Sequence, residues 1–207
     1  WRADVAYAIG YNLNRTGEYQ EANKDLHKAV ELRGDEPVFK DEMTVNDAIL
    51  AMALLSNPAN KDNKEILSTT SKLAQEALTT SDQIISENPN NVVFWKSRFR
   101  LFFTLSQGNS QYISKALEAI QKATDLAPND ANIQYNLGVL YGQNNQIAKG
   151  TEILEKTIAL KPDYTDARYA LGLFYHALSE HFGLRARRAF LLLGRQKRTA
   201  AKETLDY

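Results

Sequence analysis

The sequence predicts an all-α fold built from tandem helix–turn–helix repeats. Three observations lead to this prediction. A stretch of the chain repeats itself with a fixed period, the apolar residues in each copy have helical rather than alternating spacing, and proline or glycine stands where each helix would end. Such repeats bury their apolar faces only by stacking on one another, so the array forms one continuous domain.

The period is 34 residues, and it is clearest in the C-terminal half of the chain. Segments 128–143 and 162–177 share five residues at this offset, which biased composition does not explain. The matching pairs are Pro128 and Pro162, Tyr135 and Tyr169, Leu137 and Leu171, Gly138 and Gly172, and Tyr141 and Tyr175. A repeat of this length holds a pair of helices.

Local signals place the two helices of this unit. Asn129–Asp130 is expected to cap the first helix, the second is expected over 147–160, and Pro162 stops it. Gly138 and Gly172 would each cost about 1 kcal/mol relative to alanine in a helix interior. Because this cost recurs at the same offset, we expect a neighbouring helix to pack closely on both glycines.

Residues 131–164 resemble the tetratricopeptide repeat. The matching positions are Leu137, Gly138, Tyr141, Leu154 and Pro162, whereas Gly150 replaces the usual alanine of the second helix. The resemblance implies a right-handed superhelix with a concave groove that binds other polypeptides.

Weaker copies extend the array over residues 1–182. Clear repeats are predicted at 3–36, 92–130, 131–164 and 165–182, with Ile9–Gly10 in the first and Trp95 in the second. Region 37–91 is predicted as an irregular helical repeat with helices near 37–56 and 64–87, and a longer loop is expected around 106–114.

Segment 183–207 departs from the repeat pattern. It holds seven basic and two acidic residues, although the whole chain has 25 of each. Three interpretations stay open: a divergent capping helix, a foreign or frame-shifted segment, or a basic helix for an anionic surface. Self-association through this tail is a further hypothesis.

Catalysis and cofactors find little support in the sequence. The chain has no cysteine, so thiolate chemistry and disulfides are excluded. We interpret His27, His176 and His181 as surface residues and predict no metal site, no cofactor and no enzymatic activity. The adjacent Asp41 and Glu42 are explained by favourable charge near a helix N-terminus.

No nucleic-acid partner and no membrane insertion are expected, because the net charge is zero and the apolar runs are short. The sequence leaves the compartment open. We interpret the chain as part of a longer protein whose remaining segments carry any membrane anchor or address signal.

The resemblance to tetratricopeptide domains also implies the ligand-binding residues. In that family, exposed positions of each first helix line the groove and bind peptides. The corresponding positions are Tyr7, Tyr11, Lys96, Arg100, Tyr135, Asn136, Val139, Tyr169, Leu173 and His176. Tyrosine recurs at one equivalent position, so these rings form either a binding ladder or packing between repeats. Too few cations are present for the clamp that some relatives use on a terminal carboxylate.

The predicted function is therefore a scaffold that binds a polypeptide segment. A second hypothesis comes from segments 13–42 and 158–175, which resemble the C-terminal repeat region of bacterial O-antigen ligase or polymerase-like membrane proteins. That resemblance implies a soluble accessory domain of a polysaccharide assembly enzyme. The aromatic stretch 94–103 is interpreted as a packing face with arginines at its edge.

Overall fold

The computed structural model describes residues 1–180 and 183, and in this part of the chain the regular structure is helical, without strands. The predicted all-α class of tandem helical repeats is confirmed. The chain divides into two compact units, Trp1–Ile133 and Gln134–Tyr207, and each is considered by itself. The predicted basic segment 183–207 lies outside the described residues, apart from Gly183.

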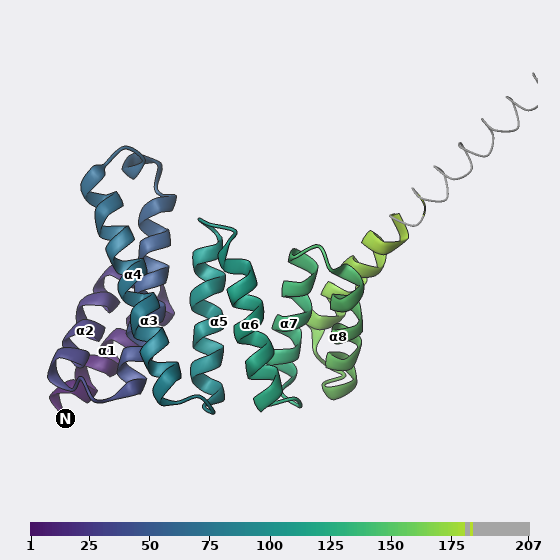
Figure 1. Ribbon diagram of the computed structural model, residues 1–207, viewed down its shortest axis with the longest axis horizontal. Coiled ribbons are helices and arrows are strands. Elements are labelled where there is room, and N and C mark those ends of the chain that lie inside the picture. Colours follow the sequence, from purple (N-terminus) through teal and green to yellow (C-terminus); the bar gives the residue numbers. More distant parts are fainter. Residues whose placement is uncertain (181–182, 184–207) are drawn as a thin grey trace, which may run out of the picture. The chain divides into compact units, whose positions relative to one another are not determined.

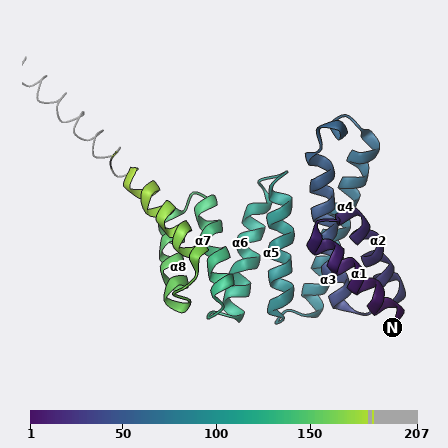
Figure 2. The same cartoon turned by 180° about the vertical axis from the view of Figure 1, so that it is seen from behind.

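The first unit consists of helical hairpins that follow one another along the chain (Figure 1). Each first helix packs on its own second helix, and α2 packs on α3, α3 on α5 and α4 on α5. The hairpins are α1 (Arg2–Thr16) with α2 (Tyr19–Leu32), α3 (Pro37–Ser56) with α4 (Lys64–Glu87), and α5 (Val92–Ser106) with α6 (Tyr112–Leu126). The same succession is visible from behind in Figure 2.

Side chains and glycine end these helices where the local sequence predicts. Gly17 terminates α1 in the left-handed region, with φ 88°, which a residue with a Cβ adopts only at a cost. Asn63 and Asn91 accept hydrogen bonds from backbone N–H groups at the start of α4 and α5. Asp130 does the same for Asn132 and Ile133, so the predicted cap is confirmed.

The irregular region forms a long hairpin in the first unit. Helix α3 has 20 residues and α4 has 24, and a short 3-10 turn (Pro58–Asn60) lies between them. The hairpin extends beyond its neighbours in Figure 1. Thr44 stands 34 residues after Gly10, so the period continues through this region without the leucine–glycine pair. Thr44 is buried, and its Oγ1 donates to the carbonyl of Lys40 at 2.7 Å.

Small residues let the two helices of a hairpin approach closely. A Cβ built on Gly10 would lie 2.8 Å from Cγ of Leu26 and 3.1 Å from the carbonyl oxygen of Ala22. Buried alanines occupy the matching side of the second helices, including Ala22, Ala29, Ala77, Ala116, Ala119 and Ala123. The helices therefore pack by backbone approach rather than by large interdigitating side chains.

The second unit contains most of α7 (Ala131–Gln143), α8 (Ile147–Leu160) and a helix over 165–180. The close approach predicted at Gly138 is confirmed, because a Cβ there would lie 3.0 Å from Cγ of Leu154. The same prediction is wrong for Gly172 within the described residues, where an added Cβ meets nothing within 4 Å.

The aromatic ring of Phe174 explains the glycine at position 150. Its edge lies against Gly142 and Gly150, and a Cβ on Gly150 would come 2.5 Å from the ring and 2.6 Å from the carbonyl of Gly138. An alanine at this position, as in the usual repeat, would have no room. The ring of Phe174 thus joins the 165–180 helix to both α7 and α8.

Candidate functional site: the first-helix face

The predicted binding residues of the first unit lie on first helices that are adjacent in space. Helix α3 packs on α5 and also contacts α1. We use the name first-helix face for the side chains of Tyr7, Tyr11, Asp41, Lys96 and Arg100. Four of them were predicted from the family resemblance, and Asp41 is added by the structure.

Tyr7 stacks between its own helix and the next first helix. Its ring lies 4.6 Å from the ring of Phe39 on α3, and 5.9 Å from the ring of Tyr11 on α1. The side chain is half-buried, and burial raises the pKa of the Tyr7 phenol. Packing between repeats therefore accounts for much of this ring. Tyr11 is the more accessible of the two, at 37% exposure.

Asp41 connects α3 to α5 at the position 34 residues after Tyr7. The Ser97 hydroxyl donates a hydrogen bond to its Oδ2 at 2.6 Å. Burial raises the pKa of Asp41 to about 7, and the bond from Ser97 and the charge of Arg100 oppose this rise only in part. Favourable charge at a helix N-terminus is thus the wrong explanation for this residue. The repeat register was the signal that could have placed it on this face.

The two cations of the face differ in how far they are committed. Lys96 lies 3.7 Å from the carboxylate of Asp130, a partly exposed ion pair. Arg100 is exposed, and its charge acts on Asp41 without an ion pair within 4 Å to any residue that the structure describes. Arg100 therefore has donors available to a ligand, whereas Lys96 must share its charge.

The remaining predicted residues belong to the second unit. Tyr135 is half-buried, with its ring 5.1 Å from that of Tyr164, and Asn136 and Val139 are on the same helix, α7. Tyr169 and Leu173 on the 165–180 helix are 71% and 52% exposed. His176 is exposed on the same helix. Their role in binding stays a prediction.

The aromatic stretch on α5 is part of the core. Phe94, Phe99 and Phe102 are buried, which leaves no platform on which a base or sugar could stack. Arg98 lies over the ring of Phe102 at 4.9 Å and pairs with Asp82 at 2.6 Å. The stretch thus packs between helices, as the sequence suggested.

The family profile of the tetratricopeptide repeat matches residues 131–164. This segment is a tetratricopeptide repeat. Its helices α7 and α8 and the glycine contact at Gly138 are the physical content of that match. No curated protein matches the chain.

Solved tetratricopeptide structures resemble the chain in fold. A thermophilic tetratricopeptide protein, TTC0263 from Thermus thermophilus, has a TM-score of 0.63 at 16% identity, over 85% of this chain and 82% of that one. Residues 41 to the end of MamA from Desulfovibrio magneticus have a TM-score of 0.60 at 21% identity, over 88% of each chain. At this identity the likeness shows the fold alone.

Other kinds of site are not seen in the described part of the chain. Within it, no group of three or more His, Cys, Asp or Glu side chains is arranged to hold a metal ion. Among the same residues, no helix combines the length and hydropathy that crossing a bilayer requires.

Proposed function

We propose that this chain is a protein-binding scaffold whose first-helix face holds an extended polypeptide. Tetratricopeptide proteins are in general interaction scaffolds rather than enzymes, and the repeat and fold support this class. The observation that carries the proposal is the arrangement in the first unit. Aromatic and charged side chains at equivalent repeat positions stay accessible on adjacent first helices, whereas the second helices pack through small buried residues.

The chemistry of the face suits a peptide main chain with mixed side chains. Tyr11 offers apolar area and a hydroxyl group at low entropic cost. Arg100 offers several donors, and Asp41 has one carboxylate oxygen not used by Ser97. Each contact is weak by itself, so useful affinity requires several residues of one ligand to bind together.

A peptide-display library is the probe that tests this proposal without a known partner. Peptides selected on the full chain are measured by fluorescence anisotropy against the double variant Tyr11→Ala/Arg100→Ala. Both residues are exposed, so the variant should stay folded. We expect affinity to fall by about tenfold or more, since each lost contact is worth about 1 kcal/mol.

The matched control changes two exposed residues of a second helix, Glu118→Ala/Lys122→Ala on α6. Peptides that bind this control and the parent equally, but bind the first-helix variant weakly, support the proposal. Equal binding to all three proteins would remove the first-helix face as the site. The accessory role in polysaccharide assembly stays a prediction, because no comparison above bears on it.

A further inference from the structure

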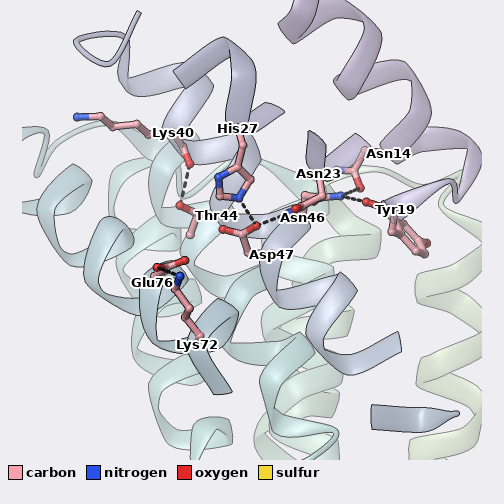
Figure 3. Close-up of polar contacts among 10 residues, drawn as sticks. All are labelled: Asn14, Tyr19, Asn23, His27, Lys40, Thr44, Asn46, Asp47, Lys72 and Glu76. Atoms are coloured by element: carbon pink, nitrogen blue, oxygen red, sulfur yellow. Dashed lines mark hydrogen bonds and ion pairs between the residues drawn. The ribbon is translucent and has the colours of Figure 1, made fainter. Parts of the chain in front are cut away.

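A polar network is buried between α2 and α3 (Figure 3). Its centre is Asp47, whose side chain is 0% exposed. Asn23 donates a hydrogen bond to Oδ1 of Asp47 at 2.6 Å, and Nε2 of His27 lies 3.0 Å from the same oxygen. The other oxygen, Oδ2, is buried without a hydrogen-bond partner among the described residues. The prediction that His27 is a simple surface residue is therefore wrong.

Amide side chains extend this network to α1. Asn46 is fully buried; it accepts from Asn23 and donates to Oδ1 of Asn14 at 3.2 Å and to the carbonyl of Tyr19 at 3.1 Å. Asn14 in turn donates to Glu42 at 2.6 Å. The first hairpin is thus bonded to α3 largely through side chains that all depend on one arrangement.

The charge balance of the network depends on His27. A buried carboxylate is costly unless a cation or several donors compensate it. The other ionisable groups that act on the pair are Glu31 on α2 and Glu76 on α4, and both are negative. Lys72 on α4 lies 3.7 Å from Glu76, so its charge is directed there. The imidazolium of His27 is then the cation that offsets Asp47.

Both members of the pair retain protons to higher pH than free side chains do. The hydrogen bond to Asp47 raises the pKa of His27 above 6.5, against the effect of burial. Burial raises the pKa of Asp47 above 3.8. A group whose pKa is raised by folding stabilises the fold below its unfolded pKa, and this contribution is lost as the pH rises through the folded value.

We propose that the His27–Asp47 pair is a pH-responsive junction that holds the first hairpin, α1–α2, on α3. With His27 protonated, the imidazolium and Asn23 compensate the buried carboxylate. When His27 loses its proton, the carboxylate keeps its neutral donors but no cation, and the junction opens locally more often. This inference does not depend on what the first-helix face binds.

Hydrogen exchange followed by mass spectrometry tests the junction on the full chain. Protection of α2 is compared at about pH 6 and about pH 8, on either side of an ordinary histidine pKa, after correction for intrinsic exchange rates. Because Asp41 also titrates near this range, the measurements use the Asp41→Asn variant as the background. We expect protection of α2 to fall severalfold at the higher pH.

The variant His27→Gln in that background keeps a donor of similar size but carries no titrating charge. Its α2 protection should be the same at both pH values. A severalfold fall that persists in His27→Gln would overturn the proposal. If this variant does not fold, the imidazole of the wild-type chain decides by NMR titration: a midpoint above 6.5 supports the junction, and a midpoint at or below 6.5 rules it out.

Discussion

The junctions after the first repeat and after repeat 131–164 occupy equivalent positions but differ in chemistry. Residues 14, 22 and 46 correspond, 128 positions later, to residues 142, 150 and 174. In the first unit this triad is Asn14, Ala22 and Asn46, and the two asparagines hydrogen-bond to each other. In the second unit it is two glycines filled by the ring of Phe174.

A second pair of positions follows the same rule. His27 and Asp47 correspond to Glu155 and Tyr175, and in both units the two side chains bond to each other. The first pair involves a fully buried carboxylate, whereas the second lies at the surface. The repeat therefore preserves which positions meet, and each repeat has its own chemistry at the meeting. Of these two pairs, the first is the one expected to make stability depend on pH near neutrality.

The largest effect is expected from Asn46→Ala at the polar junction. The change leaves donors and acceptors of Asn23, Asn14 and Tyr19 buried without partners. We expect a loss of about 3 kcal/mol in the free energy of unfolding, because each unsatisfied group costs roughly 1–3 kcal/mol. Urea denaturation measures it, and a loss below about 1 kcal/mol would contradict the central place given to this amide.

At the apolar junction, Gly150→Ala should cost about 2 kcal/mol, since overpacking against the Phe174 ring and the Gly138 carbonyl outweighs the better helix propensity of alanine. Gly172→Ala is the matched control, with nothing near its added Cβ among the described residues. It should stabilise by about 0.5–1 kcal/mol. The comparison uses thermal unfolding, and equal effects of both changes would refute the packing account.

The contrast in pH dependence sharpens with Asp41→Asn. Since folding raises the pKa of Asp41 from 3.8 to about 7, its contribution is present at low pH and is lost as the pH rises toward about 7. Asparagine should flatten this part of the stability profile in the first unit, as followed by urea midpoints between about pH 5 and about pH 8. An unchanged slope would mean that Asp41 does not titrate there.

The smallest effect is expected for Tyr175→Phe, which removes the surface hydrogen bond to Glu155. Tyr175 is 50% exposed, so water replaces the lost partner and the change should stay within about 0.5 kcal/mol. Thermal unfolding at neutral pH checks this value. A loss comparable with that of Asn46→Ala would show that the two junctions are energetically alike.

Much of the fold follows from local sequence. The period placed helices at 37–56, 64–87 and 147–160, where the structure has them, since caps, prolines and apolar spacing act within a few residues. Gly138 was likewise identified from the sequence, because a glycine repeated inside a helix signals close backbone approach.

The candidate site was only partly foreseen. Family resemblance pointed to Tyr7, Tyr11, Lys96 and Arg100, which lie on first helices of the first unit. It did not reveal that Tyr7 spends much of its ring on Phe39, or that Asp41 shares the face with Arg100. Exposure and pKa depend on what neighbouring helices cover, and a single helix pattern does not contain that information.

The sequence by itself determined the helical repeats, their boundaries and which positions recur. Tertiary structure alone decided what each position contacts: Asp47 with His27 across 20 residues, Ser97 with Asp41 across 56, and Phe174 against two glycines. The physical reason is range. Helix propensity and capping act along the chain, whereas burial of a carboxylate or a ring is set by side chains that only packing brings together.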